Sequence, residues 1–284
     1  MTQAYSKTKD TTDLTRHDRI KVMILTQTFK PEEIHGYIAR LLKREGIDVT
    51  IVYERDLIMT FNKMPMLFVN GRDISDIDVV LTFGEVNSLT LSILEKLEIM
   101  EYRTINSISQ HRISCNPYYK GYVANKLGIN VPNLVTISRI SEIPGVVEDI
   151  GTPCKISFGG KNIVLHNSMD VYTMSNILKE VVDIKESIIV SEMIDLKSKN
   201  IYSGMVIGNK ILINEDNNIT GIKPIFESIR SVVELELFTL TLAVKDNEVY
   251  LLRLTPFFDL STNIDLVIQT LSEYMKTEYK RGEW

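Results

Sequence analysis

The spacing of apolar positions changes along this chain and predicts a mixed fold of helices and strands. A β-branched run at 20–26, apolar residues at helical spacing in 31–46, and a second apolar run at 48–53 predict strand, helix and strand. Short connections between these elements predict a right-handed βαβ unit and therefore a parallel sheet. We place this α/β domain at 20–110. It continues with a strand at 78–84, a helix at 89–100 and a short strand at 104–106.

Elsewhere the chain alternates short strands with tight turns, which predicts antiparallel sheets. A helix is expected within 115–132, closed by Gly128 with Pro132 beyond it. Further helices are expected at 170–183 and 261–280, and a strand at 187–195. We therefore divide the rest of the chain into a disordered tail (1–19), a central lobe (111–186) and a C-terminal antiparallel domain (187–284). The expected hairpins turn on residues that tolerate positive φ: Asn70-Gly71, Gly159-Gly160, Gly208-Asn209 and Asp246-Asn247.

Composition narrows the functional classes. With 284 residues, of which 44% are apolar, the chain is long enough for two or three packed domains. The net charge is −5 and like charges do not form blocks, so duplex nucleic acid is not an expected partner. No apolar run suits a signal peptide or a membrane span, so no membrane partner is expected. The only cysteines, Cys115 and Cys154, fit a disulfide-free protein of the reducing cytoplasm.

The first candidate for chemistry is the glycine turn that follows Lys155. Adjacent glycines, Gly159 and Gly160, let backbone N–H groups approach a phosphate closely, and the lysine adds a positive charge. On local spacing alone, an ordinary hairpin with an exposed lysine explains the same residues. The order of segments along the chain favours the phosphate site.

That order resembles the ATP-grasp superfamily, and the chain is most similar to its RimK-like carboxylate–amine ligases. The segments that carry the resemblance are the α/β domain, a helix ending in LGINVP, the Lys155 strand with its glycine turn, the strand IIVSEMI, and a late hairpin that runs into a proline loop. The resemblance covers nearly everything after residue 19. It implies an ATP-grasp fold, of classes α/β and α+β, with a parallel α/β domain, a central lid and a C-terminal antiparallel domain.

The resemblance also implies a ligand and a reaction. ATP or another nucleotide is the expected ligand. In the family, ATP phosphorylates a carboxylate, and an amine then attacks the acyl phosphate to form an amide, for example when glutamate is added to a peptide or a cofactor. Such phosphoryl transfer needs the triphosphate charge neutralised and both reactants held in line.

Some positions agree with the nucleotide site of that family. Lys155 matches the phosphate-binding lysine, and Gly159 and Gly160 match the glycine-rich loop, here about two residues shorter. Glu192 matches the acidic residue of the hinge strand, beside which the adenine is held. A solvated carboxylate at a strand end explains Glu192 equally well.

Other positions differ. Where the family opens its central helix with Asp-Lys, this chain has Asn116-Pro117, and Lys120 one turn later is the candidate substitute. Where the family has Asp-x-Arg after the hinge, this chain has Asn200 and Tyr202. The asparagine amide can bond a ribose hydroxyl, but the tyrosine does not replace a guanidinium fork.

The metal-ligand positions differ most. Arg253 and Thr255 stand where the family has Glu-x-Asn, and Thr239 or Thr241 stands where it has an aspartate. Mg²⁺ prefers anionic oxygens and a guanidinium would repel it, so these residues argue against a Mg²⁺ site. Arg253 then contacts phosphates or forms a structural ion pair with Asp259 or Glu248. A shifted alignment would bring in nearby carboxylates, whose expected role is otherwise turn formation: Glu215, Asp216 and Asp259.

Three functional hypotheses follow. The first is a pseudoenzyme that binds a nucleotide or other ligand, or a protein partner, through a degenerate cleft, with a homo-oligomer as one form of partnership. The second is an active carboxylate–amine ligase whose Mg²⁺ ligands lie elsewhere, and a cluster of carboxylates in the folded cleft would favour it. The third is a scaffolding protein whose cleft is filled by Arg253 and nearby tyrosines.

Overall fold

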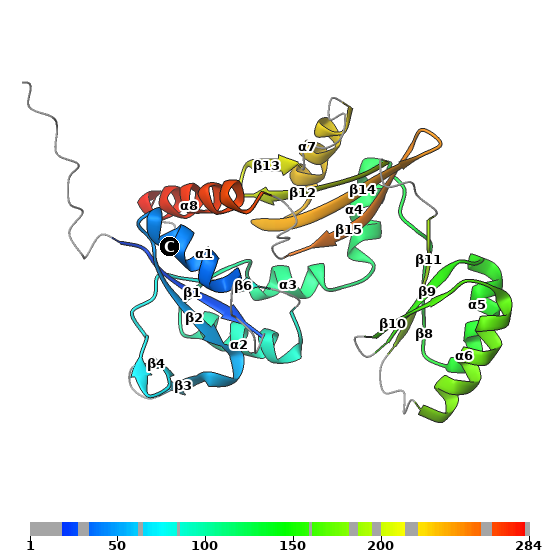
Figure 1. Cartoon of the computed structure of the whole chain (residues 1–284), viewed down its shortest axis with the longest axis horizontal. Coiled ribbons are helices and arrows are strands. Elements are labelled where there is room, and N and C mark those ends of the chain that lie inside the picture. Colours follow the sequence, from blue (N-terminus) through cyan, green and yellow to red (C-terminus); the bar gives the residue numbers. More distant parts are fainter. Residues whose placement is uncertain are drawn as a thin grey trace, which may run out of the picture.

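The computed structural model describes residues 19–27, 34–61, 65–83, 86–158, 161–181, 187–194, 200–213, 221–256 and 263–281. The N-terminal domain and the C-terminal sheet lie against each other, and the central lobe stands to one side of both (Figure 1). Apart from Arg19, the predicted tail lies outside the described residues. Among the described helices, none is long and apolar enough to cross a membrane.

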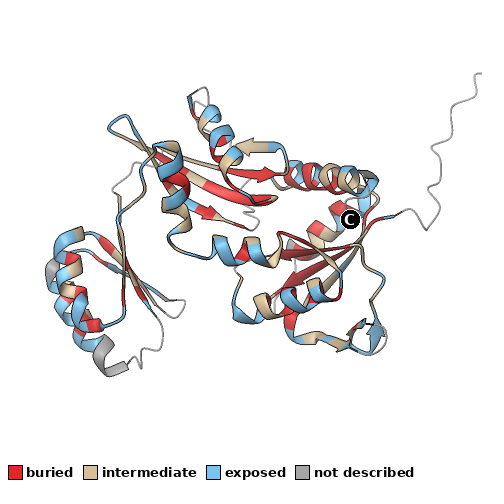
Figure 2. Ribbon diagram, turned by 180° about the vertical axis from the view of Figure 1, so that it is seen from behind, coloured by how far each residue is buried: buried red, intermediate tan, exposed pale blue. Residues whose placement is uncertain are grey.

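The N-terminal domain contains the predicted parallel sheet. Helices α1 (Ile34–Arg44) and α8 (Ile264–Arg281) contribute to the core on one face, and α2 (Ser88–Ile99) covers the other. The two central strands, β1 (Lys21–Thr26) and β6 (Val79–Phe83), are buried on both faces and therefore read as continuous apolar runs in the sequence. They form the buried centre of this domain in Figure 2. The strands follow the order β2-β1-β6-β7, in which β2 is Asp48–Tyr53 and β7 is Arg103–Ile105.

A small antiparallel sheet extends this domain. The predicted hairpin at 66–74 is confirmed, with φ of 51° at Asn70 and 74° at Gly71. The pattern of apolar residues did not predict β3, because a short apolar run has no period that separates a strand from a helical turn. The 3-10 turn η1 (Glu54–Asp56) leads into β3, and the sheet has the order β3-β4-β5: β3 Leu57–Phe61, β4 Pro65–Val69 and β5 Arg72–Asp73.

The C-terminal sheet is antiparallel, as predicted, and both of its hairpins are confirmed. Asp246 and Asn247 turn the second hairpin with φ of 52° and 65°. One sheet face joins the core of the N-terminal domain, and the other packs on α4 (Tyr119–Leu127) and α7 (Lys223–Val232). The strand order is β13-β12-β14-β15: β12 Ile201–Ile207, β13 Lys210–Ile213, β14 Leu237–Lys245 and β15 Glu248–Thr255.

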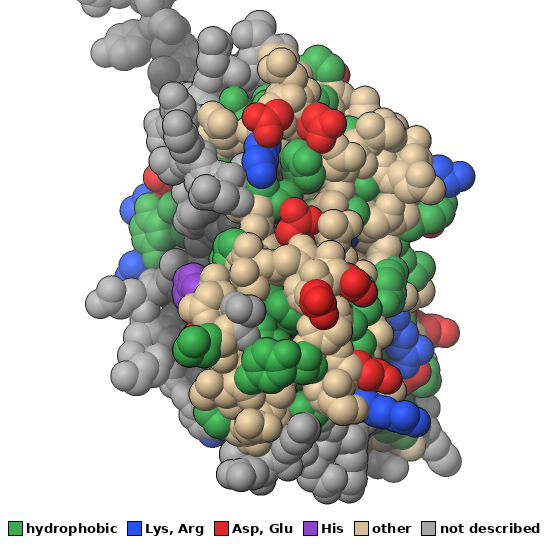
Figure 3. All heavy atoms as spheres, turned by 90° about the vertical axis from the view of Figure 1, so that its right-hand side faces the viewer, with side chains coloured by type: hydrophobic (Ala, Val, Ile, Leu, Met, Phe, Trp, Pro, Cys, Tyr) green, Lys and Arg blue, Asp and Glu red, His purple; other side chains and the backbone are tan. Residues whose placement is uncertain are grey.

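The central lobe is a four-stranded sheet covered by two helices. Helices α5 (Ile143–Ile150), which follows the 3-10 turn η2 (Ile140–Glu142), and α6 (Ser168–Val181) pack on one face around a separate apolar core. Figure 3 looks at this lobe from outside, where apolar and acidic side chains are both exposed. The order is β10-β9-β11-β8: β8 Leu134–Ile137, β9 Cys154–Phe158, β10 Lys161–Leu165 and β11 Ile188–Glu192.

The structure shifts two expected limits. Strand β11 pairs with both β8 and β9, so the central sheet runs from Leu134 to Glu192 and crosses the expected division at 186. The helix expected to start at Cys115 begins later: α4 starts after the Asn116-Pro117 turn. Its end at Gly128, whose φ is 66°, is confirmed. Three helices were not predicted. The first, α3 (Ile108–Ser114), has only seven residues and therefore little periodic signal, whereas the apolar residues of α5 and α7 do recur at helical spacing.

The packing of α7 on β12 makes Gly204 sensitive to substitution. A methyl group at this position would lie 2.5 Å from Phe226 Cε1 and 2.8 Å from the Leu212 carbonyl oxygen. We expect Gly204→Ala to lower the free energy of unfolding by about 1 to 3 kcal/mol through overpacking, measured by urea denaturation. In α5, Gly145 has no atom within 4 Å of the same methyl position. Gly145→Ala is therefore the matched control, and a loss of stability as large as that of Gly204→Ala would contradict the packing argument.

Candidate functional site

A cleft of about 260 Å³ lies between the central lobe and the edge of the C-terminal sheet. Strands β9 and β11 form one side, β15 forms the other, and the beginning of α4 lies at its base. Three cationic side chains from three separate elements line it: Lys120, Lys155 and Arg253. Hydroxyl and amide groups add to the polar lining, from Ser114, Asn116, Ser157, Ser191 and Thr255.

Lys120 stands in the first turn of α4 and reaches the neighbouring strand. Its Nζ donates to the Leu252 carbonyl oxygen at 3.1 Å. Burial, and secondarily the charge of Lys155, lowers the pKa of Lys120 below its ordinary value. Both lysines therefore bring positive charge into a partly desolvated cleft, where an anionic ligand would relieve their repulsion.

Lys155 lies on β9, opposite Ser191 of β11. It is half-buried, and its backbone carbonyl oxygen accepts a hydrogen bond of 3.4 Å from the Ser191 hydroxyl. The register of β9 and β11 thus turns Lys155 and Ser191 toward the same cleft. The turn at Gly159 and Gly160, expected to cradle phosphate, lies outside the described residues.

Arg253 projects from an exposed position of β15, and the strand register places hydroxyl groups beside it. Arg253 pairs with Thr241, and Thr255 pairs with Thr239, on β14. Thr241 in turn shares a hydrogen bond of 3.2 Å with Ser203 of β12. In the described part of the chain, the buried Thr255 Oγ1 has no hydrogen-bond partner.

This group of side chains does not match the ligand preference of a hard divalent cation. Mg²⁺ takes carboxylate, carbonyl and water oxygens, whereas this face offers neutral hydroxyls and a guanidinium. Across the described ranges, His, Cys, Asp and Glu side chains form no group of three that could hold a metal ion. The carboxylates considered from the sequence lie outside those ranges: Glu215, Asp216 and Asp259.

Glu192 and Asn200 are not among the residues that line the cleft. Glu192 is bonded twice to Asn133 at the entry to β8: its N–H donates to the Asn133 carbonyl at 2.9 Å, and its carboxylate accepts from the Asn133 N–H at 3.1 Å. Asn200 is half-buried and directly precedes β12. Glu192 therefore ties β11 to the chain that enters the central lobe.

The sequence alternative of an Arg253–Glu248 ion pair is wrong. The two residues stand five positions apart on β15, a separation of about 17 Å, which is too long for their side chains to bridge. Glu248 instead accepts hydrogen bonds of 3.0 Å from Asn130 Nδ2 and from the Tyr250 hydroxyl. The other proposed partner, Asp259, lies outside the described residues.

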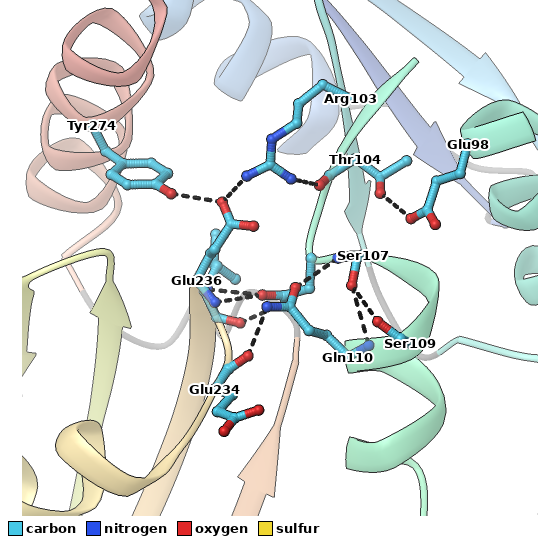
Figure 4. A network of polar contacts seen from close by, with 11 residues as sticks. Glu98, Arg103, Thr104, Ser107, Ser109, Gln110, Glu234, Glu236 and Tyr274 are labelled. Atoms are coloured by element: carbon cyan, nitrogen blue, oxygen red, sulfur yellow. Dashed lines mark hydrogen bonds and ion pairs between the residues drawn. The ribbon is translucent and has the colours of Figure 1, made fainter. Parts of the chain in front are cut away.

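A polar network that the sequence did not predict holds the C-terminal sheet against the N-terminal domain (Figure 4). Glu236 lies between Arg103, with which it forms an ion pair, and the Tyr274 hydroxyl, which donates to it at 2.6 Å. Burial, followed by this hydrogen bond, raises the pKa of Tyr274 above its ordinary value. Below them, Gln110 Nε2 donates to the Glu234 carbonyl at 2.6 Å. No sequence motif marks these residues, because their partners are distant in sequence.

Comparison with solved structures identifies the fold. No family model and no curated protein matches the chain. A RimK domain ATP-grasp protein from Sphaerobacter thermophilus superposes with a TM-score of 0.71 at 11% identity, over 89% of this chain and 98% of that one. A RiPP-associated ATP-grasp ligase from Chryseobacterium gregarium was solved with ADP and a leader and core peptide. It superposes with a TM-score of 0.64 at 12% identity, over 91% of this chain and 97% of that one. D-alanyl-alanine synthetase A from Vibrio cholerae superposes with a TM-score of 0.68 at 12% identity, over 90% of this chain and 96% of that one.

Proposed function

We propose that this chain, which has the ATP-grasp fold, is a RimK-like nucleotide-binding protein that holds phosphates without Mg²⁺ and does not turn ATP over. The observation that carries the proposal is the convergence of Lys120, Lys155 and Arg253 on one cleft. Arg253 stands beside hydroxyls where the related ligases are expected to have metal-binding carboxylates.

Electrostatics favours direct contact between these side chains and phosphate. At an effective dielectric constant near 20, two like unit charges about 4 Å apart repel by about 4 kcal/mol, and a divalent ion doubles this against one guanidinium. The same guanidinium matches phosphate oxygens with two parallel N–H donors. Arg253 would therefore occupy the place of the cation and neutralise part of the phosphate charge.

The loss of the metal would also account for loss of turnover. Phosphoryl transfer in this type of site depends on metal ions that bridge the phosphates and neutralise the developing charge. An arginine neutralises charge but does not fix the oxygens of two phosphates in one coordination sphere.

An active carboxylate–amine ligase is the second candidate. It is favoured by the solved structures of the same fold, which include a ligase with bound ADP and a synthetase. This function requires metal ligands from segments outside the described residues, such as Glu215, Asp216 or Asp259. Binding of nucleotide would then depend on Mg²⁺.

The test is the melting temperature of the full chain with ATP, ADP and AMP, each with Mg²⁺ and with EDTA. A ligand at a hundred times its dissociation constant stabilises the folded state by about 2.7 kcal/mol. We expect equal stabilisation in EDTA and its loss in Lys155→Ala, while Lys96→Ala, an exposed lysine on α2, keeps it. Stabilisation that requires Mg²⁺ would favour the ligase, and none with any nucleotide would favour the scaffolding hypothesis.

A double substitution tests the role assigned to Arg253. Arg253→Glu with Thr255→Asn places a carboxylate and an amide on the face that now carries a guanidinium and a hydroxyl. We expect nucleotide stabilisation of this variant to require Mg²⁺, because the cation would again be needed to neutralise the phosphates. If this variant and the natural chain bind nucleotide equally well without Mg²⁺, Arg253 does not contact the phosphates.

A further inference from the structure

The outermost strand of the small sheet, β3, exposes apolar side chains along an open edge. Ile58 is 56% exposed and Phe61 is 54% exposed. All five residues of β3 are uncharged, and four are apolar. In Figure 1 this sheet lies at the periphery of the N-terminal domain, away from the central lobe.

One face of β3 belongs to the core, and the other carries an isoleucine and a threonine. Leu57 and Met59 pack against the cluster under α2. Ile58 and Thr60 point to the opposite face, since side chains alternate along a strand. On that face, Ile58 pairs with Phe68 of β4 and Thr60 pairs with Met66 of β4. Both of these apolar partners are only half-buried.

The two edges of this sheet differ. β5 forms one edge with two exposed charged residues, Arg72 and Asp73, a common protection against pairing with another chain. β3 forms the other edge and is bonded to β4 on one side. Within the described ranges, no backbone hydrogen bond reaches its outer side. An uncharged, largely apolar edge of this kind is suited to pair with a further strand.

We propose that a second copy of this chain pairs with this edge, β3 against β3, in antiparallel orientation about a two-fold axis at Met59. The axis would place Ile58 of one copy across from Thr60 of the other. The uncharged strand offers no repulsion to its own copy, and a two-fold contact needs only one self-complementary surface. The result is a continuous sheet in which the Ile58 side chains of both copies lie on the same face, close to the two-fold axis.

The dimer should be weak and depend on concentration. Five residues from each copy bury less area than the standard interface of roughly 1,600 Å². Sedimentation velocity from about 5 to about 200 μM covers the micromolar affinity expected of such a contact. We expect the natural chain to shift from monomer to dimer over this range, and a monomer throughout would overturn the proposal.

Three variants test the register. Ile58→Lys puts a lysine into the contact, and Ile58→Lys with Thr60→Lys places like charges across the two-fold axis, so both should raise the dissociation constant at least tenfold. Ile58→Lys with Thr60→Glu places opposite charges across the axis and should recover most of that loss. If this last variant dimerises no better than the double lysine variant, the antiparallel pairing about Met59 is wrong.

Two controls separate pairing from general effects. Ile99→Lys changes another apolar side chain, 68% exposed, on α2, and should leave dimerisation unchanged. If it weakens the dimer as much as Ile58→Lys, the contact lies elsewhere and the proposal fails. Thermal unfolding followed by circular dichroism should give similar melting temperatures for the two double variants, Ile58→Lys with Thr60→Lys and Ile58→Lys with Thr60→Glu. Any difference between their dissociation constants is then caused by strand pairing and not by a difference in stability.

Discussion

Replacing Asn106 by alanine is expected to lower the free energy of unfolding by about 3 to 5 kcal/mol, because several buried backbone groups would lose their partners at once. Asn106 is 1% exposed and stands directly after β7. Its Oδ1 accepts from the N–H groups of Glu236 and Leu237 at 2.8 and 3.0 Å. Its Nδ2 donates to the carbonyls of Leu237 and Pro256 at 2.7 and 3.1 Å.

The effect should extend to the cleft. Pro256 follows directly on Thr255, so Asn106 holds the end of the strand that carries Arg253. Urea denaturation measures the stability loss, and nucleotide-dependent melting should show weaker stabilisation in the same variant. Asn125→Ala, an exposed asparagine on α4, is the control and should change stability by less than about 0.5 kcal/mol. Equal effects of the two variants would contradict the role of Asn106 in joining the domains.

Acidification is expected to destabilise the protein through His111. This side chain is fully buried, with Nε2 3.4 Å from the Thr82 hydroxyl oxygen. Burial lowers the pKa of His111 from 6.5 to about 4. The unfolded chain therefore binds a proton that the folded chain excludes, and stability present above pH 6.5 is lost as the pH falls toward 4.

The contribution of His111 over this window is about 3 kcal/mol, from 1.36 kcal/mol per unit of pKa difference. Urea denaturation at a series of pH values measures it. His111→Gln removes the titrating group and should flatten the dependence between pH 6.5 and 4, whereas His166→Gln, at an exposed position, should leave it intact. An unchanged pH dependence in His111→Gln would show that other groups cause the acid sensitivity.

The parts of the fold that depend on neighbouring residues could be predicted from sequence. The βαβ unit follows from the apolar runs of β1 and β2 and the helical spacing between them. The hairpin turns follow from residues that adopt positive φ, such as Asn70-Gly71 and Asp246-Asn247. Strand β3 was missed, because a segment of five residues carries too little periodic signal. Helix α7 was missed although its apolar residues recur at helical spacing, at Ile225, Phe226, Ile229 and Val232.

The candidate site divides in the same way. Sequence alone determined the order of segments, which resembles that of ATP-grasp proteins, and the presence of Arg253, Thr255 and Lys155. Their proximity depended on the pairing of β14 with β15 and on the placement of β9 and β11 across the cleft.

Only the tertiary structure decided what Glu192, Glu248 and Asn106 bond. Glu192 bonds Asn133, 59 positions away, and Asn106 bonds Leu237, 131 positions away. Local propensity acts over a few residues, whereas these hydrogen bonds form only when burial brings distant segments together and leaves their polar groups without water. Sequence thus determined which chemical groups the chain has, and the packing of its domains determined which of them meet.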